Sequence, residues 1–152
     1  MSELKSELLF EMIADLEEPQ PIGATPHGVR MIYYVTGGTF KGPEISGKVL
    51  PGGGDWILMR PDGAGELDVR ATLCTDDNEL IYVRYRGILE ISPEIMEQIQ
   101  SGTEVDPSEY YFRTAPVFET ASEKYGWLNR IISVGVGTAL TNRVSYKVYR
   151  IL

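Results

Sequence analysis

The sequence predicts an all-β protein: a single antiparallel β-barrel of about 8–10 strands, with one short helix near residues 93–101 and one domain over residues 1–152. Three observations carry this prediction. The chain holds 16 Gly and 9 Pro, which divide it into short pieces. Between these breaks apolar residues recur at every second position, which is typical of strands with one buried face. A single segment carries the start and stop signals of a helix.

The first half of the chain shows four strand-like segments. Leu8, Phe10 and Met12 recur at every second position, and residues 31–36 are rich in Val, Ile and Tyr. Residues 45–50 and 56–60 flank a glycine cluster. Residues 60–63, Arg-Pro-Asp-Gly, read as a turn.

The next two strands have the clearest alternation. Apolar residues occupy every second position from Leu67 to Leu73 and again from Ile81 to Tyr85. The connector, residues 75–79, is predicted to be a hairpin loop in which Asn78 adopts a positive φ.

The helix and the last three strands complete the barrel. Ser92 is the predicted N-cap, Pro93 the first helical residue, and Gly102 the stop signal. Three more strands are expected over residues 110–115, 130–137 and 144–152. Glycines at positions 135 and 137 share one face of their strand, as at points where a barrel coils tightly, so a barrel is favoured over a sandwich.

Composition excludes several classes of function. The net charge of −8, with scattered Lys and Arg, opposes binding to nucleic acid or to an anionic membrane. One cysteine, Cys74, and no signal-peptide pattern predict a cytoplasmic protein. With a single histidine, His27, a zinc or histidine-cluster metal site is not expected, and no cofactor is expected.

The best pointer to a site is the segment 37–56, with seven glycines in twenty positions. Glycine is kept where φ must be positive or where backbone approaches closely. The segment ends in Gly-Gly-Gly-Asp-Trp, so it is expected to turn the chain and deliver Asp55 and Trp56 to a particular place. It lacks the Gly-Lys-Ser/Thr ending of a phosphate-binding loop.

A charged strand face leaves two interpretations open. Asp68, Arg70 and Thr72 share one face of their strand, spaced by about 6.5–7 Å. Such a face is either a solvated exterior of cross-strand ion pairs or the lining of a ligand-binding interior.

A second cluster combines aromatic and polar residues over 110–120 and 125–129. Aromatic walls with a few placed polar groups are typical of ligand pockets, although the same residues also suit a loop that fills the end of the core. The expected ligand-binding residues are Trp56, Arg70, Arg113, Phe118, Tyr125, Trp127 and Asn129.

Asp55 and Glu119 are the candidate catalytic acid and base groups. Each lies beside a large aromatic residue, whose contact would raise a carboxyl pKa by desolvation. Arg70 and Arg113 are expected to hold a substrate carboxylate through paired hydrogen bonds.

Several ordered motifs are similar to those of an uncharacterised bacterial and fungal family, "domain of unknown function 3237". They include Gly37-Gly-Thr-Phe-Lys-Gly-Pro43, Leu50-Pro-Gly-Gly-Gly-Asp-Trp56, Leu67-Asp-Val-Arg70, Thr75-Asp-Asp77, Phe112-Arg-Thr-Ala-Pro-Val-Phe-Glu-Thr120 and Trp127-Leu-Asn129. The resemblance covers about Leu8 to Tyr149. It implies a β-barrel with a helix at one end and no settled activity. The family's usual Asp-Asp-Gly hairpin is Asp76-Asp77-Asn78 here.

The predicted function is binding of a small aromatic or carboxylate-like molecule in the barrel mouth, with cofactor-independent acid/base chemistry of the lyase, isomerase or cyclase kind. Two alternatives stay open: a non-catalytic binding module, and a structural or interaction protein whose barrel is packed solid. Tyr33 and Tyr34 would suit a homodimer interface, and the sequence leaves the oligomeric state open.

Overall fold

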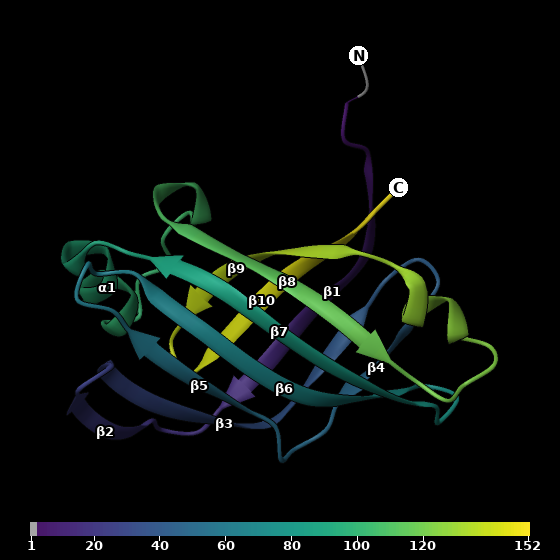
Figure 1. The fold of residues 1–152 in the computed structure, drawn as a ribbon, viewed down its shortest axis with the longest axis horizontal. Coiled ribbons are helices and arrows are strands. Elements are labelled where there is room, and N and C mark those ends of the chain that lie inside the picture. Colours follow the sequence, from purple (N-terminus) through teal and green to yellow (C-terminus); the bar gives the residue numbers. More distant parts are fainter. Residues whose placement is uncertain (1–2) are drawn as a thin grey trace.

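Ten strands form one antiparallel sheet that curls until its first strand pairs with its third (Figure 1). The computed structural model describes residues 3–152. The strands are β1 (Ser6–Leu16), β2 (Gln20–Thr25), β3 (Gly28–Lys41), β4 (Ser46–Val49), β5 (Gly54–Met59), β6 (Gly65–Thr75), β7 (Leu80–Glu90), β8 (Tyr111–Glu119), β9 (Ser133–Leu140) and β10 (Arg143–Ile151). The predicted antiparallel barrel is therefore confirmed.

Eight strand positions close the barrel, because β4 and β5 share one of them. Both strands lie between β3 and β6, and residues 50–53 form a bulge that separates them. The bulge is tied to β3 by hydrogen bonds from the Val35 N–H to the Gly53 carbonyl (2.8 Å) and from the Gly52 N–H to the Val35 carbonyl (3.1 Å). A Cβ on Gly53 would lie 2.5 Å from the Arg70 carbonyl oxygen, so this position requires glycine.

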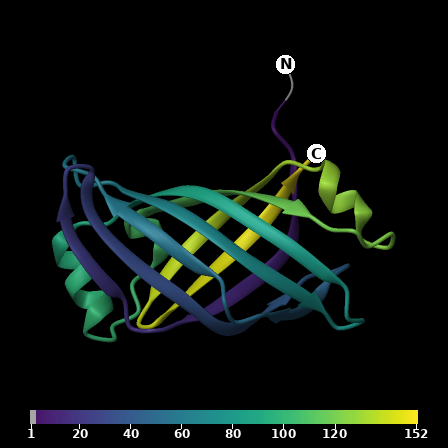
Figure 2. The same ribbon diagram turned by 60° about the horizontal axis from the view of Figure 1, so that its bottom comes forward.

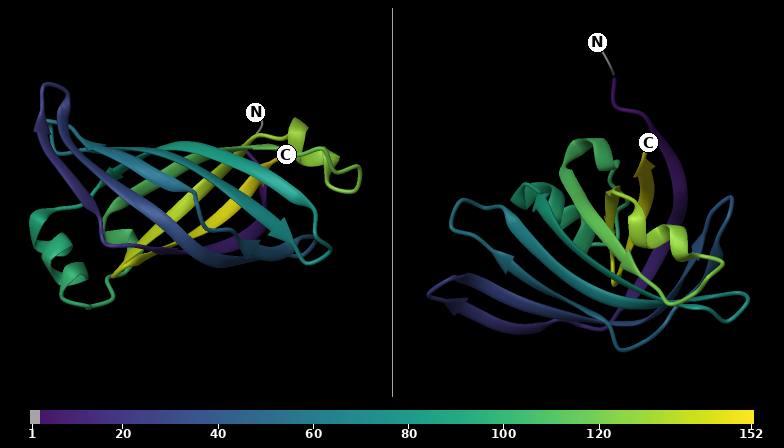
Figure 3. Two further views of the ribbon diagram at one scale, coloured as in Figure 1. Left: turned by 90° about the horizontal axis from the view of Figure 1, so that it is seen from below. Right: turned by 45° about the vertical axis from the view of Figure 1, so that its right-hand side comes forward.

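The hairpin of β2 and the first half of β3 extends past the barrel wall, at the lower left of Figure 1 and the upper left of the left-hand view in Figure 3. The sequence analysis did not predict β2. Its residues include Pro21 and Gly23, which resemble a loop, and the register with β3 shifts between them. β3 is also longer than the predicted strand 31–36, since Gly37 and Gly38 continue it by pairing with Asp15 and Ala14 of β1. A Cβ on Gly38 would collide with the Ile13 carbonyl of β1.

Different structures cover the two ends of the barrel (Figures 1 and 2). The α1 end carries helix α1 (Pro93–Gln100) and the short 3₁₀ helix η1 (Pro107–Glu109). The η2 end carries residues 120–132, with the 3₁₀ helix η2 (Gly126–Arg130). The helix prediction is confirmed: the Ser92 hydroxyl accepts a hydrogen bond from the Ile95 N–H, and Gly102 follows with φ +92°.

The core at the η2 end is filled by aromatic rings. Phe10 packs edge-on against Phe40 and Phe118, with centroid distances of 5.4 and 6.0 Å. Leu128 of η2, 1% exposed, closes this end. The interior is therefore tightly packed at this end.

Candidate functional site

The glycine bulge sets the direction of Asp55. Directly after the bulge, Asp55 lies opposite Tyr33 of β3 and Val69 of β6. Residues directly opposite in an antiparallel pair share a face, and Val69 is buried in the core, so the Asp55 side chain points into the barrel. One carboxylate oxygen accepts a hydrogen bond from the Asp68 N–H at 3.1 Å.

Three tyrosines share this part of the interior with Asp55. Tyr85 and Tyr146 are buried, and their rings meet edge-on with centroids 5.3 Å apart. Phe112 packs on Tyr146 at 5.4 Å. Burial raises the pKa of both tyrosines above its usual range, and the negative charge of Asp55 raises it further. Tyr33 shows the same pKa direction, from burial and then from Asp55.

Burial is also the main influence on the pKa of the Asp55 carboxyl, which it raises from 3.8 to about 7. The neighbouring charge of Asp68 adds to the rise, whereas the Asp68 N–H and Arg30 oppose it. Among the described residues, Asp55 takes part in no ion pair. Asp55 thus exchanges a proton close to neutral pH, as a general acid or base requires.

Apolar side chains also pack on the core at the α1 end of the barrel. Its rim is made of apolar side chains that pack on the core but stay partly exposed: Leu16, Met31, Met59, Ile91, Ile95, Ala139 and Val144. They come from the ends of β1, β5 and β9, the starts of β3 and β10, and the α1 segment. Asp55 and Tyr33 are themselves only partly buried.

The charged face of β6 lies outside the barrel. Leu67, Val69 and Leu73 are buried, so Arg70, at the alternate parity, is exposed with Asp68 and Thr72 beside it. This decides the question that the sequence left open in favour of the exterior. Arg70 lies opposite Arg84 on the neighbouring strand and does not reach Asp55.

Asp55 does not meet Arg113 or Glu119 either, the other groups expected to act on a ligand, and Trp56 faces away from it. Arg113 alternates outward on β8, where its Nη1 donates to the Phe112 carbonyl at 2.9 Å. Glu119 is exposed at the last position of β8. Trp56 follows Asp55 directly and so faces the exterior, edge-on to Tyr34 at 6.3 Å.

The remaining predicted ligand residues build the η2 end. Phe118 is part of the aromatic core, and the Tyr125 hydroxyl donates to Asp77 at 3.0 Å. Trp127 stacks under the Arg150 guanidinium at 5.4 Å. Asn129 exchanges two hydrogen bonds with the Thr120 backbone, at 2.8 and 3.0 Å. Each of these four side chains therefore has a structural partner other than Asp55.

The sequence reasoning missed the tyrosines that surround Asp55. A signal for Tyr85 was available, since it continues the inward parity of Ile81 and Val83 on β7. For Tyr146, the same parity links it to Val148 on β10. Only the closed sheet, however, brings β3, β5, β7 and β10 together around one carboxyl group.

No helix within residues 3–152 is long and apolar enough to cross a lipid bilayer. No group of three or more His, Cys, Asp and Glu side chains in the same range is placed to hold a metal ion.

Residues 3–152 thus form a closed antiparallel β-barrel in which the carboxyl group of Asp55 points into the interior. The chain belongs to the family described as "Protein of unknown function (DUF3237)", whose model matches residues 4–151. The resemblance noted from the motifs is thereby confirmed.

Relatives with similar sequences are members of the uncharacterised UPF0311 group. A UPF0311 protein of Clostridium acetobutylicum is 38% identical over 152 residues, which covers 99% of this chain and 96% of that protein. A UPF0311 protein of Rhodopseudomonas palustris is 36% identical over 149 residues, covering 98% and 97%.

Solved structures share the barrel. A conserved protein of unknown function from Rhodopseudomonas palustris aligns with a TM-score of 0.93 at 35% identity, covering all of both chains. A β-barrel-like protein from Acinetobacter baumannii aligns with a TM-score of 0.86 at 36% identity, covering 100% of this chain and 98% of that one. An enzyme from Penicillium herquei aligns with a TM-score of 0.74 at 23% identity, covering 100% and 97%, a likeness of fold.

Proposed function

We propose that the barrel binds a small, uncharged organic molecule at its α1 end and catalyses a proton transfer in which Asp55 carries the proton. The observation that carries this proposal is a carboxyl group inside the barrel with a pKa of about 7 and no ion-pair partner among the described residues. Isomerisation, elimination and ring closure include reactions of this kind that a positioned acid or base catalyses without a cofactor.

The tyrosines supply the complementary role. All three are protonated at neutral pH, since burial raises a pKa whose ordinary value is already 10.0. Tyr85 and Tyr146 share a hydrogen bond with each other, which leaves one hydroxyl of that pair and the Tyr33 hydroxyl as donors. Donors in a desolvated site stabilise negative charge that develops on a carbonyl oxygen when a neighbouring carbon loses a proton. Asp55 would then remove the proton from carbon, and a tyrosine hydroxyl would stabilise the negative charge on the oxygen.

The lining favours an uncharged substrate. The inward positions of β5, β6 and β7 hold Asp55 as their one charged side chain, and the others are apolar, Gly, Thr or Tyr. A carboxylate would find no arginine there and would be repelled by ionised Asp55. We therefore propose an uncharged aromatic or carbonyl compound as the ligand of this site, in place of the carboxylate-bearing ligand expected from the sequence.

The fold is compatible with catalysis, because a protein described as an enzyme has the same barrel. That likeness concerns the fold alone, and the proposal rests on Asp55. We also propose that the protein works in the cytoplasm, supported by its single cysteine, Cys74.

A second candidate is binding without catalysis, which the same aromatic lining would serve. The packed η2 end supports the further alternative of a purely structural barrel. Neither the binding module nor the structural barrel gives a reason for an unpaired acid inside the barrel, whereas the catalytic proposal does. Its desolvation is a cost that apolar packing would remove.

The test is a thermal-shift screen of small aromatic ketones, phenols and aromatic carboxylates, followed by ¹H NMR of each hit in D₂O. A ligand raises the melting temperature. For ketone hits we expect the protein to catalyse exchange of the protons on the carbon beside the carbonyl, with a rate that rises with pH and levels off above about 7. Replacing Asp55 with Asn should lower this rate by about 10²–10⁴-fold.

Glu119→Gln is the matched control, because Glu119 is an exposed carboxyl on the outer face. Its exchange rate should equal that of the native protein. Binding with no catalysed exchange would favour the binding module, and the absence of any hit across the screen would favour the structural barrel. Equal exchange rates in D55N and the native protein would contradict the role of Asp55.

A further inference from the structure

The barrel wall is interrupted between β5 and β6, directly beside Asp55. The pairing of these two strands joins residues 54–55 to residues 69–70 and residues 58–59 to residues 65–66, and it skips the two positions between them. The skipped residues of β5 are Trp56 and Ile57. The gap therefore begins at the residue that follows the acid of the proposed site.

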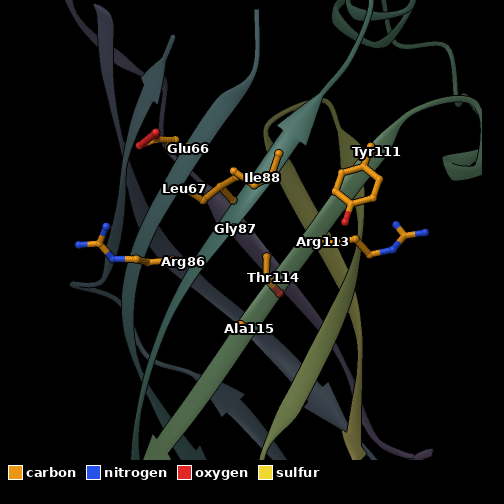
Figure 4. Close-up of a pocket in the computed structure, with 9 residues that line it drawn as sticks. All are labelled: Glu66, Leu67, Arg86, Gly87, Ile88, Tyr111, Arg113, Thr114 and Ala115. Atoms are coloured by element: carbon orange, nitrogen blue, oxygen red, sulfur yellow. The ribbon is translucent and has the colours of Figure 1, made fainter. Parts of the chain in front are cut away.

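The wall on the other side of β6 is continuous. The pairing of β6 with β7 runs without a gap from Gly65 to Cys74. The outer face of this wall carries a depression, from which the Arg86 and Arg113 guanidinium groups extend to opposite sides (Figure 4). These two arginines do not converge on one ligand, so the gap beside Asp55 is left as the place where the wall and the site meet.

The gap removes a main-chain hydrogen bond between the strands. Main-chain groups alternate in direction along a strand. The Gly53 carbonyl faces β3, where it accepts from the Val35 N–H at 2.8 Å, so the Trp56 carbonyl, three residues later, faces β6. The register places Asp68 opposite Trp56. In an unbroken sheet the Asp68 N–H would donate to the Trp56 carbonyl.

Side chains bind both of these main-chain groups instead. The Arg30 Nη1 donates to the Trp56 carbonyl at 2.7 Å. The Asp68 N–H donates to a carboxylate oxygen of Asp55 at 3.1 Å. Main-chain donors and acceptors away from water need partners, so the two exchanges depend on each other. While Arg30 holds the carbonyl, the N–H is left for Asp55.

Arg30 reaches this carbonyl from the outside of the barrel. It has the same outward parity on β3 as Ile32, which lies opposite Trp56, so its side chain runs over the outer side of β5. It is partly buried, and it takes part in none of the five ion pairs among residues 3–152. Its guanidinium is therefore committed to a main-chain carbonyl and not to a carboxylate.

Several titratable or charged side chains act on Asp55 from the surrounding strands. They are Arg30 and Tyr33 of β3, Asp68 of β6, Tyr85 of β7 and Tyr146 of β10. Burial and the Asp68 charge raise the pKa of the Asp55 carboxyl, whereas the Asp68 N–H and the Arg30 charge lower it. Arg30 is the one cation of this set.

We propose that Arg30 is a positioning residue for Asp55: by holding the Trp56 carbonyl, it leaves the Asp68 N–H to fix the orientation of the Asp55 carboxylate. This inference rests on the proposed proton-transfer function, which needs a base of defined orientation. Without Arg30, the Asp68 N–H would return to the Trp56 carbonyl as in an unbroken sheet. The carboxylate would then lose its main-chain hydrogen bond.

The first test follows the Asp68 amide of the ¹⁵N-labelled full chain by NMR from pH 5 to 9, with no ligand added. In the native protein its shift should follow the ionisation of Asp55, with a midpoint near 7. Arg30→Met should remove most of this pH dependence. It should also raise the midpoint of the Asp55 carboxyl carbon by about 0.5–1 pH unit, because a hydrogen bond and a positive charge are both lost.

Two further variants separate charge from geometry. Arg30→Lys keeps the charge without the planar fork, so it should leave the Asp55 midpoint close to native and weaken the response of the Asp68 amide. Arg84→Met is the matched control, since Arg84 is an exposed arginine of β7 that lies opposite Arg70. It should leave both signals unchanged. A melting temperature close to native shows that each variant is folded.

The second test measures proton exchange of a ketone hit from the thermal-shift screen. At pH 6, Arg30→Met should be slower than the native protein by at least about 3–10-fold, because a higher midpoint lowers the ionised fraction of Asp55 by this factor. At pH 9.5 Asp55 is ionised in both proteins, so the remaining difference reports orientation alone. There we expect Arg30→Met to be about tenfold slower.

Two results would overturn the positioning role. One is a native pH dependence of the Asp68 amide in Arg30→Met, and the other is an equal exchange rate of the two proteins at pH 9.5. The amide test uses the protein alone, so it separates this inference from the proposed function. A native protein that catalyses no exchange would contradict the proposed function and would leave the amide result unaffected.

Discussion

Replacing Asp55 with Asn should stabilise the protein at alkaline pH. Asp55 has its pKa raised from 3.8 to about 7 by burial, so the folded state binds a proton that the unfolded state releases over this range. Stability is therefore greatest below about pH 4, falls as pH rises toward 7, and is constant for this group above 7. Asparagine removes this loss, and its side-chain oxygen can still accept from the Asp68 N–H.

The magnitude follows from the pKa. At 1.36 kcal/mol for each pH unit, a rise from 3.8 to about 7 corresponds to at most about 4 kcal/mol. Relaxation around the partly exposed carboxylate reduces this, so we expect D55N to exceed the native protein by about 2–4 kcal/mol at pH 8.5. For a chain of this length that is about 5–15 °C in melting temperature.

The assay is urea unfolding followed by circular dichroism, for both proteins at pH 4.5, 7 and 8.5. The difference between the two free energies of unfolding isolates Asp55, because all other titrating groups are common to both. It should grow from at most about 1 kcal/mol at pH 4.5 to its full value at pH 8.5. A difference that stays the same at all three pH values would refute the reasoning that Asp55 is desolvated.

Two further predictions concern the scaffold. Gly53→Ala should destabilise the fold by about 1–3 kcal/mol in urea unfolding, because its Cβ would lie 2.5 Å from the Arg70 carbonyl, whereas Gly126→Ala, whose Cβ meets nothing within 4 Å, should change stability by less than about 0.5 kcal/mol. Equal effects of the two would contradict the steric account of the bulge. Phe10→Ala should cost about 3–5 kcal/mol by the same measurement, because its ring fills the η2 end between Phe40 and Phe118. A loss under about 1 kcal/mol would mean that this end is not tightly packed.

The fold was predictable where local patterns agree with the sheet. The alternation in residues 66–74 and 81–86 gave β6 and β7, and Asn78 takes the predicted positive φ, 66°. β2 was missed because an exposed strand with Pro21 and Gly23 has no buried face to produce alternation. β8 extends beyond the expected residues 110–115 and includes Pro116. Proline, which has no N–H to donate, is tolerated at this position because the pairing of β8 with β9 has already ended at Thr114.

Of the candidate site, the sequence predicted one residue, Asp55. The glycine bulge pointed to Asp55, and the raised pKa expected for its carboxyl agrees with its burial. The partners expected for it were chosen by residue type, but whether a strand residue faces in or out depends on register. Arg70, Arg113 and Trp56 all fall on the outward parity, and Glu119 is exposed at the last position of β8. Long-range pairing supplies Tyr85 and Tyr146 instead.

The most direct test of the central claim is the titration of the Asp55 carboxyl carbon by ¹³C NMR between pH 3 and 9, assigned with the D55N variant. The desolvated carboxyl inside the barrel should titrate with a midpoint near 7. A midpoint near 4, the ordinary value for an aspartate in water, would contradict both the burial of the charge and the role of Asp55 as a proton carrier at neutral pH.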